Sequence, residues 1–366
     1  MSLTAGIVGL PNVGKSTLFN AITDAQVEAA NYPFATIEPN KGVVEVPDAR
    51  LEKLSSMWNP KKTTFTTFEF TDIAGLVKGA SKGEGLGNQF LANIRNTDAI
   101  CEVVRCFEDK DITHVEGSVD PIRDIDIINL ELVLADYQTV ENRIGKIEKK
   151  AKSGDKEAKE EVTILYKIKD VLEMDQPARS LEFSKEEMVY VKQWSLLTMK
   201  PLIYVANVGE EDLEDPEANP YYQKVVEVAK KENAKVVPIC AKIEAELSGL
   251  DREEKAVFLE ELGITESGLD RLIKEAYALL GLRTFFTVGP EECRAWTFKA
   301  GSSAPEMAGI IHSDFQRGFI KAETYSYDDL MIYGSEAALK EAGKIRQEGK
   351  QYIGQDGDVM FFKFNV

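Results

Sequence analysis

Short apolar runs separated by polar turns and helical repeats dominate the first part of the chain, which is typical of an α/β fold. A glycine-rich turn follows the first run and leads into residues 17–23, which read as the first turns of a helix. Runs that predict strands occur at residues 4–8, 64–71, 99–107, 201–206 and 235–240. We therefore expect an α/β domain built around these strands.

The hydrophobic period becomes helical between residues 129 and 193. Apolar residues recur there at helical spacing until Ser153-Gly154-Asp155 interrupts the pattern. A further helix is predicted from Ser184, where Glu187 completes a capping box. Two long helices joined by a short polar turn form an αα-hairpin, so we expect residues 129–195 to be a helical, coiled-coil insertion into the α/β domain.

The pattern changes again after residue 280. Ala304-Pro305-Glu306 opens a short helix, because proline fits the first helical turn. Strands are indicated on both sides of it, at residues 284–288, 294–298, 318–324 and 359–364. This order favours a small β-grasp fold. The predicted domains are residues 1–128 with 196–280, the insertion at 129–195, and residues 281–366.

Residues 9–16 fit the phosphate-binding pattern G-x-x-x-x-G-K-[ST] at every fixed position. A glycine-rich turn from strand to helix directs backbone N–H groups and a helix N-terminus at one point, which suits a polyphosphate. Lys15 is expected to reach the β- and γ-phosphates, and the Ser16 hydroxyl to bind Mg²⁺. The alternative is a glycine turn that binds nothing.

A second motif, Asp72-Ile73-Ala74-Gly75, follows the strand predicted at residues 64–71. Asp72 is expected to hold Mg²⁺ through water, and the Gly75 N–H to meet the γ-phosphate. Between the two motifs, Thr36 lies in a polar loop at the position of the first switch of regulatory NTPases, where it would be a second protein ligand to Mg²⁺. The alternative for Thr36 is an ordinary surface hydroxyl.

Leu76 occupies the place where many small GTPases carry the glutamine that orients the attacking water. An apolar side chain does not position a water molecule, so another group is needed or hydrolysis is slow. His114 is a candidate, since a neutral imidazole accepts a proton or orients water; the alternative is a solvated loop histidine. Asn12, within the phosphate loop, is a candidate ligand for a monovalent cation such as K⁺.

Base recognition is predicted to differ from that of GTPases. They typically place N-K-x-D after a late strand, whereas this chain has Asn207-Val208-Gly209-Glu210 after its strand at residues 201–206. Polar groups discriminate strongly only when they are correctly placed, so a lengthened carboxylate at Glu210 weakens the preference for guanine and leaves room for adenine. Ala241 follows the last strand, at the site of another base-contacting loop. Alternatively, Asn207 is only a turn residue at a strand end.

Together, residues 9–16, residues 72–80, the altered motif at residues 207–210 and the C-terminal sequence resemble the YchF group, the Obg-like ATPases. The resemblance covers essentially the whole chain. It implies a P-loop NTPase with an Obg-type G domain and a C-terminal TGS domain, which binds and slowly hydrolyses ATP in preference to GTP with Mg²⁺. By this resemblance Ser16 and Thr36 bind the metal, and Asn207 and Val208 contact the base. Phosphate contacts are implied for Asn12, Val13, Gly14, Lys15, Ser16 and Thr17.

Family members are associated with the ribosome and with stress responses, so the resemblance implies a ribosomal protein or rRNA as partner. The net charge of −18 argues against broad binding to nucleic acid, which depends on lysine and arginine, and we expect no sequence-specific DNA partner. The sequence shows no apolar run of about 18 residues that would span a bilayer. We also find no secretory signal. A cytoplasmic protein without a membrane partner is therefore expected.

The sequence thus predicts an ATP-hydrolysing switch. Two rivals remain: a GTPase of the same fold, and an interaction protein that nucleotide merely stabilises. A metabolite kinase is disfavoured, because the D-x-x-G motif and switch spacing suit a nucleotide sensor.

Overall fold

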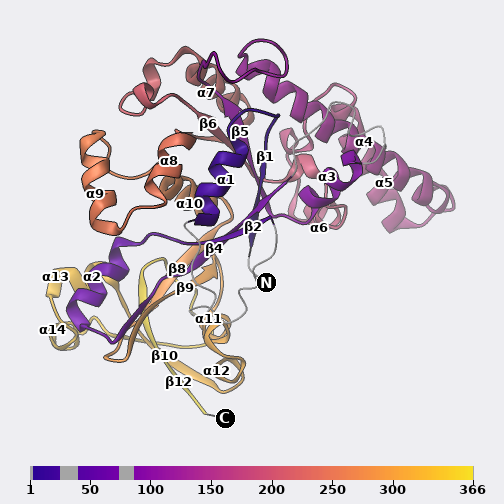
Figure 1. Cartoon of the computed structure of the whole chain (residues 1–366). Helices are drawn as coiled ribbons and strands as arrows, with labels where there is room; N and C mark the ends of the chain where they lie inside the picture. The colour runs from indigo at the N-terminus through magenta and orange to yellow at the C-terminus, as the bar shows by residue number, and fades with distance from the viewer. Residues whose placement is uncertain (1–2, 25–39, 74–85, 366) are drawn as a thin grey trace. The chain divides into compact units, whose positions relative to one another are not determined.

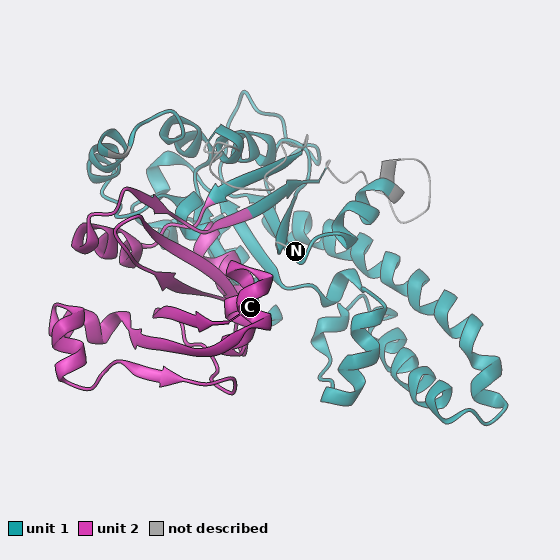
Figure 2. Cartoon of the chain, turned by 90° about the horizontal axis from the view of Figure 1, so that it is seen from below, with its two compact units in different colours: residues 1–44, 69–272 teal, residues 45–68, 273–366 magenta. Residues whose placement is uncertain are grey.

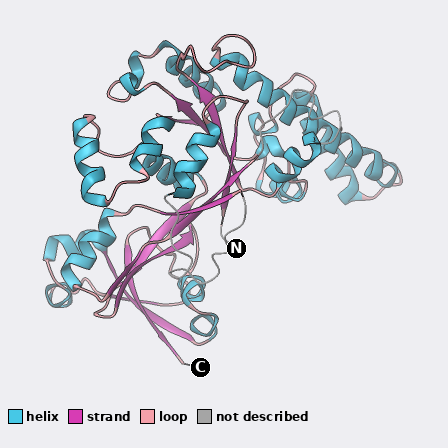
Figure 3. Cartoon of the chain, in the orientation of Figure 1, coloured by secondary structure: helices cyan, strands magenta, loops and turns pink. Residues whose placement is uncertain are grey.

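The computed structural model describes residues 3–24, 40–73 and 86–365 of the chain. The chain forms two compact units, one of residues 1–44 and 69–272 and the other of residues 45–68 and 273–366 (Figure 2). Both units contain a β-sheet with helices packed against it (Figure 3). None of the described helices is long and apolar enough to cross a membrane.

The first unit is built on a six-stranded sheet in the order β2-β4-β1-β5-β6-β7. The pairs β1–β4, β1–β5, β5–β6 and β6–β7 are parallel, so their carboxyl ends meet at one edge of the sheet. Both β5 and β6 are buried along their whole length, as expected for strands covered on both faces. The strands are β1 (Thr4–Val8), β2 (Lys41–Glu45), β4 (Thr67–Asp72), β5 (Ala99–Arg105), β6 (Leu202–Asn207) and β7 (Lys235–Ile239).

Helices cover both faces of this sheet. Figure 1 shows α1 and α8 to one side of the strands and α3 and α4 to the other. The strands predicted from the sequence are all present, and the first has the predicted bounds. The helices are α1 (Lys15–Asp24), α3 (Leu86–Arg95), α4 (Pro121–Lys152), α7 (Pro220–Glu232), α8 (Ala241–Leu247), α9 (Arg252–Glu261) and α10 (Gly268–Leu279), the last of which ends in the second unit.

The predicted αα-hairpin consists of α4 and α5 (Lys156–Leu172), which run side by side in Figures 1 and 2. Gly154 makes the turn between them with a φ of 101°, a left-handed conformation that glycine adopts without strain. The helix α6 (Lys185–Gln193) begins with the predicted capping box of Ser184 and Glu187. The first helix begins at Pro121 rather than at residue 129, because Pro121 fits a first turn and residues 121–128 already pack against the sheet.

Asp136 attaches this helical arm to the segment that leads back into the sheet. Its carboxylate accepts hydrogen bonds from the Leu197 N–H at 2.8 Å and the Thr198 N–H at 2.7 Å. The Thr198 hydroxyl donates a third bond at 2.6 Å. Burial nevertheless raises the pKa of Asp136, because the loss of hydration destabilises the charged carboxylate more than these hydrogen bonds stabilise it.

The second unit has a mixed six-stranded sheet in the order β11-β10-β12-β8-β9-β3, in which β3 is Lys62–Thr64. Its faces have separate cores, and the adjacent residues Phe285 and Phe286 point into one each. The hairpin of β8 and β9, followed by a helix and further strands, matches the predicted β-grasp order. The elements are β8 (Leu282–Thr287), β9 (Glu292–Lys299), α11 (Ala304–Ile311), α12 (Ser313–Arg317), β10 (Phe319–Ser326), α13 (Tyr327–Tyr333), α14 (Glu336–Glu341), β11 (Arg346–Glu348) and β12 (Asp358–Phe364).

Residues 45–68 belong to this second unit, although the sequence-based boundaries placed them in the nucleotide-binding domain. They form α2 (Ala49–Trp58) and β3 (Lys62–Thr64), and β3 pairs in parallel with β9. Leu51 and Leu54 are fully buried in the same core as Phe286. The segment is therefore held by apolar burial and by strand pairing with residues far along the chain.

Candidate functional site

The turn from β1 to α1 has the backbone geometry of a phosphate loop. Asn12 and Gly14 adopt left-handed conformations, with φ values of 63° and 95°. A Cβ atom on Gly14 would lie 2.1 Å from Nδ2 of Asn207, so only glycine fits at this position. The Leu18 N–H donates to the Gly14 carbonyl at 3.0 Å, which starts α1 at the end of the turn. The N-terminus of α1 therefore opens toward the loop, as a polyphosphate requires.

Lys15 and Asp72, predicted separately from two motifs, form an ion pair. Register places them together, because Asp72 at the end of β4 is the partner of Ile7 in β1. The Lys15 side chain is largely buried, and a buried cation needs such a counter-charge. A bound phosphate would supply a second counter-charge and compete with Asp72 for Lys15.

Asn207 connects three parts of the site. Its Nδ2 donates to the Val13 carbonyl at 2.8 Å, and its Oδ1 accepts from the Ala241 N–H at 3.0 Å. Only 4% of Asn207 is exposed. Asn207 is thus more than a turn residue at a strand end, since it fixes the phosphate loop and the start of α8 to the end of β6.

A cavity of about 1120 Å³ opens at this edge of the sheet. Its volume is slightly above the usual range of small-molecule sites, about 300–1,000 Å³. Val13 contributes through its carbonyl bond to Asn207 rather than as a wall residue. The predicted residues that line it are Asn12, Gly14, Lys15, Ser16, Thr17, Asn207, Val208, Glu210 and Ala241.

The far wall of the cavity was missed by sequence analysis. Phe107, Asp109 and Ile112 line it, and the buried Arg105 shapes their loop. The Arg105 guanidinium donates to the carbonyls of Phe107 at 3.1 Å and Ile112 at 3.0 Å, and to that of Asp109 at 3.4 Å. It also lies 4.6 Å from the centre of the Phe107 ring. An arginine within an apolar strand was the available signal, because buried arginines need several acceptors.

His114 is buried rather than solvated, and it is not among the residues that line the cavity. Its Nε2 lies 2.7 Å from Asp124 Oδ2, and its Nδ1 accepts the Glu116 N–H at 3.1 Å. Both ring nitrogens therefore have partners. Asn12 donates its side-chain amide to the carbonyl of the neighbouring Thr113 at 3.1 Å, so its Oδ1 is the atom suited to a cation.

Among the predicted metal ligands, Ser16 lines the cavity and Asp72 ends the adjacent strand. A hydroxyl and a carboxylate are the hard oxygen donors that Mg²⁺ prefers, so the donor set fits this ion. No group of three or more histidine, cysteine, aspartate or glutamate residues that would hold a metal occurs in the part of the chain that the structure describes. Thr36 and Gly75, like Leu76, lie outside the described residues.

Comparison with known proteins places the chain in a family. A family model described as "50S ribosome-binding GTPase" matches residues 4–135, and one for the C-terminal domain of YchF GTPases, described as "protein of unknown function", matches residues 282–365. The protein named "Ribosome-binding ATPase YchF" from Bacillus subtilis is 64% identical over 366 residues, with both chains fully covered. The chain belongs to the YchF family. Its fold class is the predicted one, a P-loop NTPase domain with an inserted helical hairpin and a C-terminal β-grasp domain.

Two further YchF proteins are similar to this chain over nearly its full length. The protein of the same name from Escherichia coli O157:H7 is 56% identical over the full length of both chains. The solved structure of the Schizosaccharomyces pombe YchF GTPase superimposes with a TM-score of 0.89 at 40% identity, covering 99% of this chain and 98% of that one. This YchF family member therefore shares both the order and the arrangement of its elements with a relative of known structure.

Proposed function

We propose that this chain is a Mg²⁺-dependent nucleotide hydrolase that binds and slowly hydrolyses ATP in preference to GTP, and that it works as a nucleotide-controlled switch on the ribosome. One observation carries the base preference: Val208 and Glu210 replace the residues of a guanine clamp. Val208 is buried, and its N–H donates to the Ile239 carbonyl at 2.8 Å. Glu210 Oε2 lies 3.5 Å from the ammonium group of Lys242.

This arrangement weakens the preference for guanine and admits adenine. A guanine clamp needs a carboxylate that accepts two N–H groups of the base, and Lys242 occupies part of the acceptor capacity of Glu210. A valine in place of lysine also removes the long stem that packs along guanine. A site that no longer pairs with the guanine donors loses its discrimination against adenine.

The chemistry proposed for the site is in-line attack of water on the γ-phosphate. Lys15 would leave Asp72 and stabilise the charge on the β- and γ-phosphates, while backbone N–H groups of residues 12–17 hold the phosphate chain. Ser16 and Thr36, with Asp72 through water, would hold Mg²⁺, which neutralises charge on the phosphates. The freed carboxylate of Asp72 links phosphate binding to metal binding.

The base preference is tested by restoring a guanine clamp. Calorimetric titration with non-hydrolysable ATP and GTP analogues, with Mg²⁺ and K⁺ present, should show tighter ATP binding for the natural chain. In the double variant Val208→Lys/Glu210→Asp, we expect the ratio of the two affinities to shift toward GTP by at least about tenfold. The control is Glu211→Asp, which shortens a neighbouring cavity residue outside the motif. Tighter GTP binding by the natural chain would refute the ATPase proposal and leave the fold intact.

His114 is proposed to orient the attacking water in place of the missing glutamine at Leu76. For this, the imidazole has to exchange one of its present partners, Asp124 or the Glu116 N–H, for water. His114→Asn should then lower kcat by about a hundredfold with little change in KM. Loss of thermal stability with an unchanged kcat would show instead that His114 only holds its loop to α4.

The ribosome is proposed as partner because the relatives are named ribosome-binding. The helical arm and the C-terminal β-grasp domain are the proposed binding modules. A role for K⁺ at Asn12 is part of the same proposal: turnover measured in K⁺ and in Na⁺ should differ, and Asn12→Ala should abolish the difference. Equal rates in both salts would remove K⁺ from the mechanism.

A further inference from the structure

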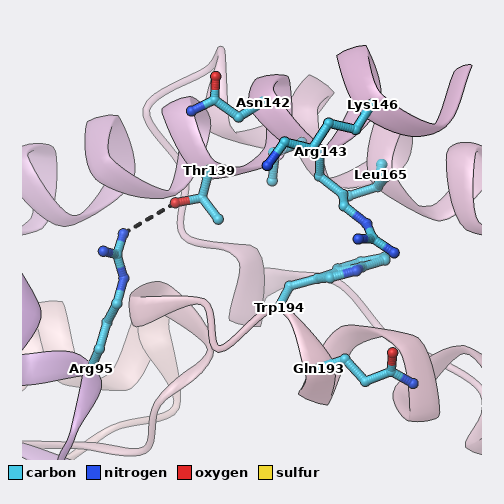
Figure 4. Close-up of a pocket in the computed structure, with 9 residues that line it drawn as sticks. Arg95, Thr139, Asn142, Arg143, Lys146, Leu165, Gln193 and Trp194 are labelled. Carbon is cyan, nitrogen blue, oxygen red and sulfur yellow. Dashed lines mark hydrogen bonds between the residues drawn. The ribbon is translucent and has the colours of Figure 1, made fainter.

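A second hollow lies within the first unit, where the helical arm meets α3. We call it the arm pocket. It has a volume of about 350 Å³, and Val140 and Leu165 provide apolar surface. Its polar walls come from α3, α4 and the end of α6, and they carry Arg95, Thr139, Asn142, Arg143, Lys146, Gln193 and Trp194 (Figure 4).

Three cations, Arg95, Arg143 and Lys146, line the arm pocket, although acidic residues outnumber basic ones by 62 to 44 in the chain. Arg95 donates to the Thr139 hydroxyl at 3.1 Å, and its charge favours the ionised form of Asp136, but within the described ranges it makes no direct ion pair. Lys146 has no ion-pair partner among the residues that the structure places. Two of the three cations at this pocket of an acidic protein thus lack a direct ion pair, and such cations attract an anion.

Trp194 gives the pocket a flat wall. The buried Glu161 fixes this wall, since one of its oxygens accepts from Arg143 Nε at 2.6 Å and from the Trp194 indole N–H at 3.2 Å. Figure 4 shows the Arg143 guanidinium directed toward the indole ring. Because the described contacts of Arg143 use only Nε, its two terminal amino groups remain for a ligand.

We propose that the arm pocket binds one nucleotide unit, with its phosphate held by Arg95, Arg143 and Lys146 and its base against Trp194. Guanidinium groups bind phosphate through paired N–H donors, and aromatic rings stack with bases of any identity. The pocket volume suits a single nucleotide. We call the cavity of about 1120 Å³ beside the phosphate loop the nucleotide cavity. The arm pocket shares no lining residue with it, so the proposal does not depend on how ATP is bound.

The test monitors the environment of the Trp194 side chain by ¹⁹F NMR. The full chain has three tryptophans, Trp58, Trp194 and Trp296, so labelling with 5-fluorotryptophan gives three ¹⁹F resonances, which Trp194→Phe assigns. The nucleotide cavity is first saturated with Mg²⁺ and a non-hydrolysable ATP analogue. Inorganic phosphate, AMP and a short single-stranded oligoribonucleotide are then titrated separately, to distinguish a free nucleotide from one within RNA.

A saturating shift of the Trp194 resonance alone is expected with AMP or with the oligoribonucleotide, at lower concentration than with phosphate. Arg95→Gln/Lys146→Gln should weaken this binding by at least about tenfold, since it removes two charged donors without breaking an ion pair. The matched control, Lys159→Gln on α5, should leave it unchanged. Equal binding of phosphate and AMP, no shift, or equal weakening by Lys159→Gln would overturn the proposal, and ATP binding in the cavity serves as an independent check of folding.

Discussion

The nucleotide cavity and the arm pocket both bring cations to a hollow, but they differ in how those cations are partnered. In the nucleotide cavity, Lys15 is paired with Asp72, and both ends of the Asn207 amide are engaged. In the arm pocket, Arg95 and Lys146 have no direct ion pair within the residues described, and Arg143 pairs with Glu161 only through Nε, which leaves its two terminal amino groups available. A ligand of the first site must displace an internal partner, whereas a ligand of the second enters without such an exchange.

This difference has a functional consequence. Exchange of partners couples binding to rearrangement. In the proposed mechanism, a phosphate that paired with Lys15 would release Asp72 for the metal, so the site would distinguish occupied from empty states. A pocket with unpaired cations gains Coulomb energy on binding but has no second arrangement to switch to. We therefore expect switching to depend on the nucleotide cavity, while the arm pocket acts as a receptor.

The largest effect should come from removing the cation of the nucleotide cavity. Lys15→Ala is expected to lower nucleotide turnover by at least about a hundredfold, because charge on the γ-phosphate loses its main protein partner. Single-turnover hydrolysis measures this directly. Lys146→Gln, which removes a cation of the arm pocket, is the matched control and should leave turnover unchanged.

The same pair of variants tests the rival in which turnover is incidental. Cosedimentation with ribosomes in the presence of nucleotide would show whether Lys15→Ala loses its partner together with its activity. Retained ribosome binding without turnover would favour an interaction protein. Turnover of Lys15→Ala within about threefold of the natural chain would contradict the proposed chemistry altogether.

A smaller effect is expected from breaking the polar connections of the cavity. Asn207→Ala leaves the Val13 carbonyl and the Ala241 N–H without their partner, and each buried polar group left unpaired costs about 1–3 kcal/mol. We predict that the free energy of unfolding falls by about 2–4 kcal/mol in urea titration. Nucleotide affinity should fall as well, since the phosphate loop and the start of α8 would no longer share a hydrogen-bond partner.

The control for this variant lies at the arm pocket. Asn142→Ala removes an amide that lines that pocket at an exposed position, so it should change stability by less than about 0.5 kcal/mol. If Asn207→Ala changed the free energy of unfolding as little as Asn142→Ala, the hydrogen bonds of Asn207 would not be what holds the phosphate loop and α8 in place.

The two sites also differ in how far the sequence predicts them. Residues 9–16 and Asp72 belong to contiguous motifs next to strands, and the parallel register then brings Lys15 and Asp72 together without further information. The arm pocket has no such motif. Arg95, Arg143 and Trp194 come from separate segments, and only the packing of α3, α4 and the end of α6 makes them neighbours.

The same reason explains what was missed in the fold. Residues 45–68 join the second unit through the pairing of β3 with β9 and a hydrogen bond of 2.6 Å from Thr64 to Glu292. Periodicity predicts an element from its own neighbours in sequence, so it predicted the apolar strands and the arm helices well. It carries no information on which distant strand a three-residue strand such as β3 will join.

The smallest predicted effect concerns pH and again separates the two sites. Glu244, on the helix α8 that begins at Ala241, is buried and accepts the Gly268 N–H at 2.8 Å. Burial raises the pKa of Glu244 from 4.5 to about 7. Between these values the folded protein keeps a proton that the unfolded chain has lost, so the free energy of unfolding should fall as pH rises.

We expect this contribution to reach about 1–2 kcal/mol between about pH 5 and about pH 7. Glu244→Gln cannot exchange this proton, so its unfolding free energy should lack that part of the pH dependence, whatever its absolute stability. Glu246→Gln, at an exposed position of the same helix, should keep the slope of the natural chain. Urea titrations across this range compare the three proteins. The arginine cations of the arm pocket and the phosphodiester groups of an oligoribonucleotide both keep their charge across this range, so binding of the oligoribonucleotide there should retain its affinity. AMP is not suited to this comparison, because its phosphate loses a proton at about pH 6. Parallel slopes for Glu244→Gln and Glu246→Gln would show that Glu244 does not supply this difference.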